Sequence, residues 1–104
     1  MKEISVDELN DLRNENADFQ LIDVREAHEY ALGNINGDHI PMNSVPENLN
    51  KISKDKQVVV MCRSGKRSAN VVNYLEQNGY TNVVNLEGGI IAWSQEIDSS
   101  VQFD

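Results

Sequence analysis

The chain is poor in cysteine and in basic residues. Its 104 residues include one cysteine, Cys62, which excludes an intramolecular disulfide framework and a metal site built from several thiolates. Lysine and arginine number 9 against 17 aspartate and glutamate residues, and the net charge is −8. An acidic chain of this kind is repelled by phosphate backbones and anionic lipid, so we expect no nucleic-acid partner and no membrane partner.

The chain also lacks long apolar runs. Residues 1–8 contain no apolar stretch of the kind that leads a signal peptide, and no run approaches the roughly 20 apolar residues that cross a bilayer. A free thiol stays reduced in the cytoplasm. We therefore expect a cytoplasmic protein, unless a signal peptide has been removed.

What is present fits one small domain. Hydrophobic residues make up 39% of the chain, which is enough for a single core. Without repeats or linkers, residues 1–104 are predicted to form one domain, with a frayed tail over residues 99–104. Short apolar runs predict strands at residues 19–24, 57–61 and 82–86.

Helical patterns lie between these strands. Ser5 and Glu8 have capping-box spacing and predict a helix that ends before Ala17. Ser44 and Glu47 repeat that spacing and predict a helix to about residue 52. The remaining helices are expected at 26–32, at a segment that ends with Asn78 and Gly79, and at 88–97. Strands that alternate with helices predict an α/β fold with a parallel sheet covered on both faces.

The segment after the strongest strand carries the candidate chemistry. Ligands of parallel sheets bind beyond the carboxyl ends of the strands, and Cys62 stands at such an end. Arg63, Lys66 and Arg67 follow within six positions, and Gly65 permits a backbone whose N–H groups point inward. Cations, amides and a helix N-terminus all stabilise a thiolate. We therefore expect Cys62 to be ionised at neutral pH.

The alternative is structural. Buried cysteine is often a small hydrophobic residue, and a basic loop can be a solvated helix start. However, the first turn of a helix favours Asp and Glu, whereas here it carries Lys66 and Arg67. This placement favours a bound anion.

Four segments together resemble the rhodanese-like sulfurtransferase family over almost the whole chain. The run 62–68 is similar to the family's active-site pattern Cys-x-x-Gly-x-Arg/Ser/Thr-Ser/Ala. The run 21–26 looks like its first signature, 33–37 like its Gly-His-Ile-x-Gly turn, and 86–93 like its closing Gly-Gly-x-x-x-Trp. The turn has Asn34 where the family commonly has His, and Glu29 stands where some thiosulfate-using members have Arg.

The resemblance implies a parallel five-stranded sheet with helices on both faces and catalysis through a persulfide. Cys62 would take sulfur from an anionic donor such as thiosulfate and pass it to cyanide or to a thiol. Backbone amides of residues 63–67 would hold the terminal sulfur, with Ser64 and Gly65 in this ring. Arg63 and Lys66 would attract the donor, and Arg67 would either join them or close the loop against a helix.

Other polar residues are expected to support this loop. Asp23 and Arg25, at the end of an apolar strand, would orient the loop or form a structural ion pair, and Ser68 would support the loop or cap its helix. His28 and His39 are expected to be surface or loop residues, because an ionised thiolate needs no general base. Two histidines and one cysteine at unrelated spacings argue against a metal site, and we expect no cofactor.

Two other functions remain open. A phosphatase or arsenate reductase would use a similar cysteine loop, but with five residues between Cys and Arg, whereas four separate Cys62 from Arg67. A non-catalytic or sulfur-relay module of the same family would bind a partner protein, and such modules often lack the cysteine.

Overall fold

Five parallel strands form the centre of the computed structural model, which describes residues 1–104. The strands are β1 (Glu3–Ile4), β2 (Phe19–Asp23), β3 (Asp38–His39), β4 (Gln57–Met61) and β5 (Val83–Leu86). Their order in the sheet is β1-β5-β4-β2-β3, and every pairing is parallel. The predicted five-stranded parallel sheet is therefore confirmed.

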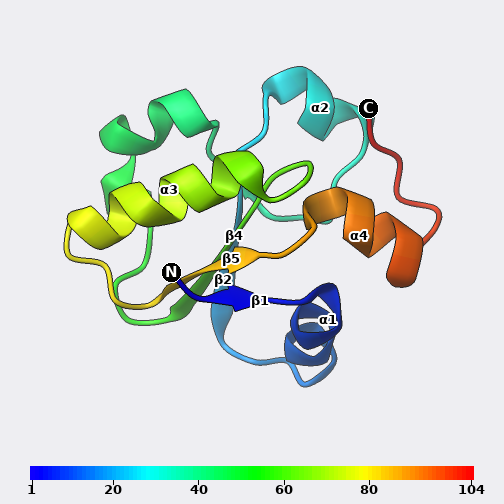
Figure 1. Ribbon diagram of the computed structural model, residues 1–104, viewed down its shortest axis with the longest axis horizontal. Coiled ribbons are helices and arrows are strands. Elements are labelled where there is room, and N and C mark those ends of the chain that lie inside the picture. The colour runs from blue at the N-terminus through cyan, green and yellow to red at the C-terminus, as the bar shows by residue number, and fades with distance from the viewer.

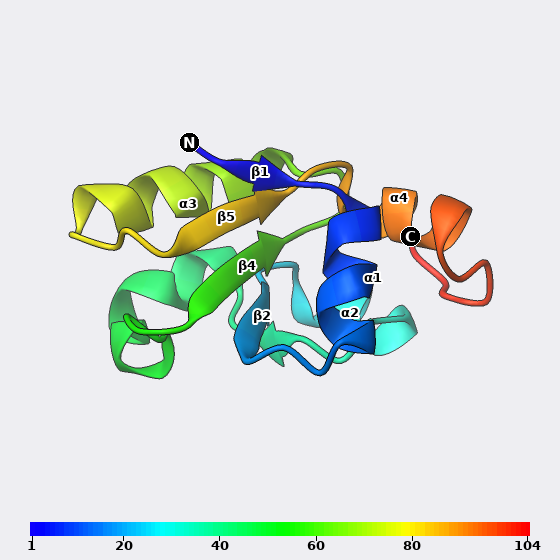
Figure 2. The same ribbon diagram turned by 90° about the horizontal axis from the view of Figure 1, so that it is seen from below.

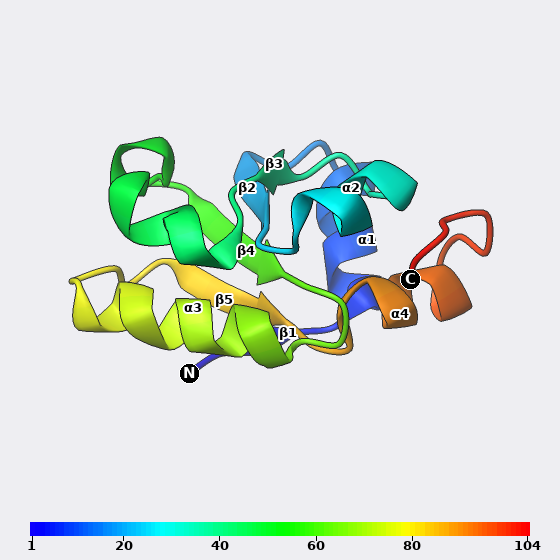
Figure 3. The ribbon, with the colours of Figure 1, turned by 90° about the horizontal axis from the view of Figure 1, so that it is seen from above.

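Helices cover both faces of this sheet (Figure 1). On one face lie α1 (Val6–Asn14) and α4 (Gly89–Glu96), and on the other lie α3 (Lys66–Gln77) and the 3-10 helices η1 (Met42–Glu47) and η2 (Leu49–Lys51). Figure 2 shows the same two layers from a second side. The short α2 (Ala27–Leu32) lies beside the C-terminal segment (Figure 3).

The side chains of β4 point alternately to the two faces of the sheet and divide the core into two clusters. Val58, Val60 and Cys62 face the side of α3, whereas Val59 and Met61 face the side of α1 and α4. Successive side chains of a strand point to opposite faces, and all of these side chains are at most 1% exposed. Burying each such apolar side chain contributes about 1.5–3 kcal/mol, so this strand anchors both layers.

Most of the predicted elements are present. Ser5 accepts a hydrogen bond from the backbone N–H of Glu8, and Glu8 accepts one from the backbone N–H of Ser5. This is the predicted capping box, and α1 ends before Ala17 as expected. The predicted strands correspond to β2, β4 and β5, and α3 ends at Asn78 and Gly79.

The helix predicted from Ser44 to residue 52 is wrong. The Ser44 hydroxyl donates to the carbonyl of Pro41 at 2.8 Å, so it does not cap a following helix. Pro46 lies inside η1 and has no N–H to donate. The segment instead forms two short 3-10 helices, a form that occurs mostly in short pieces.

Strands β1 and β3 were not predicted. Each contains two residues, which is too short for an alternating pattern to be visible. Both are edge strands that are defined by their neighbours, because Glu3 and Ile4 pair with β5, and Asp38 and His39 pair with β2.

Residues 99–104 have no regular secondary structure, but they contact the body of the protein. Val101 and Phe103 pack against the cluster under α1 and α4. Ser94 donates to the carbonyl of Val101 at 2.9 Å. Gly33 lies so close to Gln102 that a Cβ at Gly33 would overlap the carbonyl of Gln102. Fraying of this segment stays a prediction.

A buried ion pair closes the end of β2. The Arg25 guanidinium donates to both carboxylate oxygens of Asp23, at 2.8–3.1 Å, and both residues are at most 1% exposed. Arg25 also donates to the carbonyls of Glu29, inside α2, and of Gly33, the C-cap of α2, so it ties β2 to this helix. The structural ion pair expected as one role of these residues is present.

None of the helices is long and apolar enough to span a bilayer.

Replacing Arg25 by Met should reduce the free energy of unfolding by about 3–5 kcal/mol, because the Asp23 carboxylate would stay buried without its partner. The matched control is Lys56→Met, which removes the exposed ion pair between Lys56 and Asp18. That change should cost less than about 1 kcal/mol. Urea unfolding at neutral pH measures both, and equal losses in the two variants would contradict the structural role of Arg25.

Candidate active site

Cys62 lies directly after β4, at the carboxyl end of the central strands, where the sequence placed it. Its side chain is 1% exposed and faces the cluster under α3. The loop from β4 to α3 curves past the start of α4 (Figure 3). Cys62 therefore lies at the end of one strand, next to the start of α3 and the start of α4.

The loop turns at Gly65. Its φ of 104° lies in the left-handed region, which residues with a side chain resist. A Cβ at this position would lie 3.3 Å from the carbonyl of Leu86 and 3.4 Å from the amide of Gly88. Gly65 is also the N-cap of α3, so the turn that only glycine accommodates well is the turn that starts the helix.

The start of α4 holds the carbonyl groups of this loop. The amide of Ile90 donates to the carbonyl of Cys62 at 3.0 Å, and the amide of Ile91 donates to that of Arg63 at 3.2 Å. Gly89 permits this approach, since a Cβ there would lie 2.4 Å from both carbonyl oxygens. With these carbonyls bound to α4, amide groups of the loop are free to face the sulfur.

Two hydrogen-bond donors reach the Cys62 sulfur. The amide of Gly65 lies 3.1 Å from Sγ, and the hydroxyl of Ser68 lies 3.3 Å from it. Burial raises the pKa of the Cys62 thiol, but the Ser68 hydroxyl and the amides of Ser68, Gly65 and Ser64 outweigh burial and hold the pKa below its ordinary value. The surroundings of Cys62 therefore favour the thiolate, which is the nucleophilic form.

Arg67 pairs with Glu29 of α2. Its guanidinium donates to both carboxylate oxygens of Glu29, at 2.7 and 2.9 Å. The hydrogen bond from Arg67 lowers the pKa of Glu29 to about 2, against a smaller opposing effect of burial. The same pair raises the pKa of Arg67. The side chain of Arg67 thus contacts α2, and its role in the loop stays a prediction.

The other basic residues of the loop differ in their surroundings. The Arg63 guanidinium donates to the carbonyl of Asp104 at 2.8 Å and lies over the ring of Phe103. Lys66 is exposed and makes no ion pair or side-chain hydrogen bond, and Ser64 is likewise exposed without a side-chain partner. Lys66 is therefore the loop cation that is free to meet an anion.

The supporting residues form two connected groups. Asp23 and Arg25 reach the loop only indirectly, since Arg25 bonds the backbone of α2, whose Glu29 holds Arg67. Ser68 contacts the sulfur itself and is fully buried. The expected position is confirmed for His28, which is exposed. It is wrong for His39, which lies half-buried in β3, where its ring bonds the carbonyl of Arg25 and stacks on Tyr30.

Sequence reasoning missed two residues of this site. Glu29 was noted only as a departure at a family position, and its pairing with Arg67 joins residues 38 positions apart. Asn85 lies on β5, is 1% exposed, and bonds both Ser68 and the carbonyl of Gly65. A polar residue inside the apolar run 82–86 was the one available signal for Asn85.

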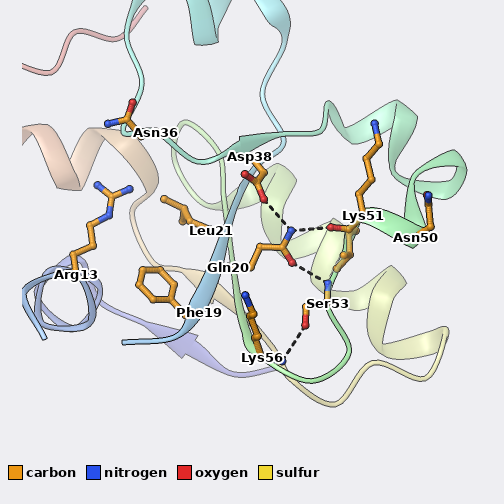
Figure 4. A pocket seen from close by; sticks show the side chains of 11 residues that line it. Arg13, Phe19, Gln20, Leu21, Asn36, Asp38, Asn50, Lys51, Ser53 and Lys56 are labelled. Carbon is orange, nitrogen blue, oxygen red and sulfur yellow. Dashed lines mark hydrogen bonds between the residues drawn. The ribbon is translucent and has the colours of Figure 1, made fainter. Parts of the chain in front are cut away.

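A polar cleft of the molecule lies away from Cys62. It has a volume of about 510 Å³ and is lined at one side by Phe19 and Gln20, the first residues of β2. It therefore lies at the amino-terminal end of β2, whereas Cys62 lies at the carboxyl end of β4. Gln20 uses its amide to bond Asp38, the carbonyl of Lys51 and the amide of Ser53 (Figure 4). The polar groups at the centre of this cleft thus hold the fold together.

No three His, Cys, Asp or Glu side chains gather in a way that could hold a metal ion.

Comparisons with known proteins agree with this fold. A family model described as the rhodanese-like domain matches residues 5–96. A sulfurtransferase of Allochromatium vinosum is 41% identical over 96 residues, which cover 91% of this chain and 90% of that protein. The thiosulfate sulfurtransferase GlpE of Stutzerimonas stutzeri is 31% identical over 90 residues, which cover 86% of this chain and 83% of that protein.

A solved structure matches over the full length. The crystal structure of a rhodanese-like domain protein from Staphylococcus aureus is 42% identical, with a TM-score of 0.86, and covers 100% of this chain and 99% of that one. The names of the two curated relatives support sulfurtransferase activity in general.

The Glu29–Arg67 pair should make the free energy of unfolding decrease at acidic pH. A carboxylate whose folded pKa lies near 2, against an ordinary 4.5, stabilises the fold at neutral pH. That stabilisation is lost as the pH falls from about 4.5 through 2. The full shift corresponds to about 3 kcal/mol, and screening at Arg67, which is 31% exposed, reduces it to the order of 2 kcal/mol.

Urea unfolding at a series of pH values tests this dependence. Glu29→Gln should be less stable than the parent at pH 7 and equal to it near pH 2. The control is Glu76→Gln, which alters an exposed carboxylate on α3 that makes no hydrogen bond. Its free energy of unfolding should equal that of the parent at every pH. A constant difference between Glu29→Gln and the parent at all pH values would rule out this assignment.

Proposed function

This chain belongs to the rhodanese-like domain family, and from that membership we propose that it transfers sulfane sulfur through a persulfide on Cys62. The observation that carries the proposal is the position of Sγ. It lies within hydrogen-bond reach of the Gly65 amide and the Ser68 hydroxyl at the start of α3. Such donors stabilise the negative charge of the thiolate that attacks the sulfur donor.

The first half of the reaction loads the enzyme. The Cys62 thiolate attacks the outer sulfur of thiosulfate, a Cys–S–S bond forms, and the S–S bond of the donor breaks. The bonding electrons leave with sulfite, and the negative charge of the enzyme moves to the terminal sulfur of the persulfide. No proton is transferred, so this step needs no general base, and the exposed His28 has no role in it.

The second half returns the enzyme to its starting state. Cyanide or a thiolate attacks the terminal sulfur, the Cys–S–S bond breaks, and its electrons return to Cys62 as the thiolate. Cyanide leaves as thiocyanate. Because the two halves use the same enzyme sulfur in turn, the kinetics are ping-pong.

The anionic donor is proposed to meet Lys66 first. Lys66 is exposed and unpaired on the first turn of α3, where the free amides of the helix also attract anions. Arg63 is engaged with Asp104 and Phe103, and Arg67 with Glu29. Thiosulfate is the donor proposed because a relative of similar length is named for it. The acceptor is a thiol, on a small molecule or on a relay protein, or cyanide.

The position of Arg67 favours sulfur transfer over phosphate-ester hydrolysis. A cysteine phosphatase needs its arginine directed at the oxyanion in the loop, with five residues between Cys and Arg. Here four residues separate Cys62 from Arg67, and both nitrogens at the end of the Arg67 side chain are bound to Glu29. A smaller ring with its arginine turned outward suits a single sulfur atom better than a tetrahedral anion.

Incubation with thiosulfate should add the mass of one sulfur atom to the intact chain, and cyanide should remove it with release of thiocyanate. Mass spectrometry before and after each reagent measures this. The matched control is Cys62→Ser, which should keep the fold by circular dichroism and gain no mass. Hydrolysis of a phosphate ester by the parent, with an unchanged mass after thiosulfate, would refute the proposal.

A further inference from the structure

The hydroxyl of Ser68 lies between two acceptors. Its oxygen is 3.3 Å from Cys62 Sγ and 2.5 Å from Asn85 Oδ1. A serine hydroxyl carries one hydrogen, so it can donate to only one of them at a time. Ser68 is 0% exposed and Asn85 is 1% exposed, so bulk water does not substitute for either acceptor.

The orientation of the Asn85 amide is fixed by its other partners. Its Nδ2 donates to the carbonyl of Gly65 at 3.1 Å and to Oε2 of Glu3 at 3.0 Å. Both partners are acceptors, so turning the amide over would place Oδ1 against two oxygens. Oδ1 must therefore face Ser68, where it accepts the hydroxyl hydrogen.

The sheet explains why these groups meet. Asn85 is on the same face of β5 as Val83, which packs in the cluster that contains Cys62. Glu3 pairs directly with Asn85 across β1 and β5. Ser68 is on the first turn of α3, which covers this face. A polar path therefore runs from β1 through β5 and α3 to the sulfur.

We propose that Asn85 is a positioning residue for sulfur transfer, because its side-chain oxygen competes with the Cys62 sulfur for the single hydrogen of the Ser68 hydroxyl. The proposal rests on the function assigned above to Cys62. Asn85 touches neither donor nor sulfur, and it acts only through Ser68.

The acceptor that the Ser68 hydroxyl prefers differs between the thiolate and the persulfide. When Cys62 is a thiolate, a charge-assisted hydrogen bond draws the Ser68 hydroxyl to Sγ. When Cys62 carries the extra sulfur, the negative charge is on the terminal atom and Sγ is a weak acceptor. The hydroxyl then turns to Asn85 Oδ1, so the buried donor stays satisfied after loading. Asn85 thus lowers the cost of withdrawing a donor from Sγ as the persulfide forms.

Two substitutions should move the titration of Cys62 in opposite directions. Ser68→Ala removes a donor from the thiolate, so the midpoint should rise by about one to two pH units. Asn85→Leu removes the competing acceptor, so the hydroxyl is left with sulfur alone and the midpoint should fall, on the order of half a pH unit. The midpoint is read from the rate of Cys62 alkylation by iodoacetamide against pH.

Three further variants separate this role from a structural one. In the double variant Ser68→Ala/Asn85→Leu, the downward shift should vanish, because Asn85 has no hydroxyl to compete for. Glu3→Ala removes a partner of Nδ2 and leaves Oδ1 in place, so it should leave the midpoint unchanged. Glu3→Gln, which keeps an acceptor there, should do the same. Upward shifts in both single variants, or a downward shift in Glu3→Ala that Glu3→Gln does not share, would overturn the proposal.

Apart from Glu3 of β1, none of the charged groups near Cys62 is changed in any of these variants. They are Arg63, Lys66 and Arg67 of the loop and α3, Glu29 of α2, Asp23 and Arg25 at the end of β2, and Glu87 before α4. The Glu3 variants show how far the loss of that one charge moves the Cys62 midpoint. A rise in Ser68→Ala together with a fall in Asn85→Leu is therefore attributable to Ser68 and Asn85.

A measurement on the parent covers the case in which Asn85→Leu fails to fold. In an ¹⁵N-labelled sample, the side-chain amide of Asn85 should show an inflection at the Cys62 midpoint, and Ser68→Ala should remove it. The matched control is Asn82, whose Nδ2 bonds the carbonyls of Ser53 and Lys56 far from the sulfur. An Asn85 signal that does not change through the titration would overturn the proposal.

These readouts do not require sulfur transfer. Opposite shifts in a chain whose mass thiosulfate leaves unchanged would refute the proposed function and retain the competition for Ser68. A chain that loads sulfur normally but shows shifts of the same sign would refute the role of Asn85 alone.

Discussion

A buried sulfur anion is stable only where hydrogen-bond donors reach it, and the fold of this chain brings those donors to Cys62. The thiol lies 1% exposed at the end of the central strand, where burial alone would keep it protonated. The Ser68 hydroxyl and the amides of Ser68, Gly65 and Ser64 outweigh burial and hold the pKa of this thiol below its ordinary value. The chemistry proposed for the protein depends on this balance, because a neutral thiol would not attack a sulfur donor.

Much of the surrounding structure serves to hold those donors in place. The amides of Ile90 and Ile91 bind the loop carbonyls from one side, and the Glu29–Arg67 pair fixes the loop from the other. Arg25 joins β2 to α2 by hydrogen bonds to backbone carbonyls. Each contact is modest, but together they leave the loop with few alternative conformations, which is what preorganised stabilisation of an anion requires.

The sequence predicted the parts of the fold that rest on local patterns. The apolar runs of β2, β4 and β5 and the Ser5 capping box were visible, because strand alternation and capping depend on neighbours in the chain. The Ser44 capping box was misleading, since Pro46 and the contact of Ser44 with Pro41 favour 3-10 turns. The five-strand count came from family resemblance, because β1 and β3 are too short to produce a pattern.

The site shows the same division. Cys62 and its loop could be identified from a thiol, a glycine and three cations in one short segment. Asn85 and the partner of Arg67 could not, because their contacts join elements that are distant in sequence. Charge in the loop was visible in advance, but which cation stays free depended on the tertiary fold, which engages Arg63 and Arg67 and leaves Lys66 exposed.

The most direct test of the account is the ionisation of Cys62 in the unmodified chain. As the only cysteine, it is the only source of thiolate absorbance in the ultraviolet below the range in which tyrosine ionises. We predict a transition midpoint below the roughly 8.5 of a free cysteine. A midpoint at or above that value would show that the buried environment outweighs its donors, and would contradict the claim that this loop maintains a sulfur nucleophile.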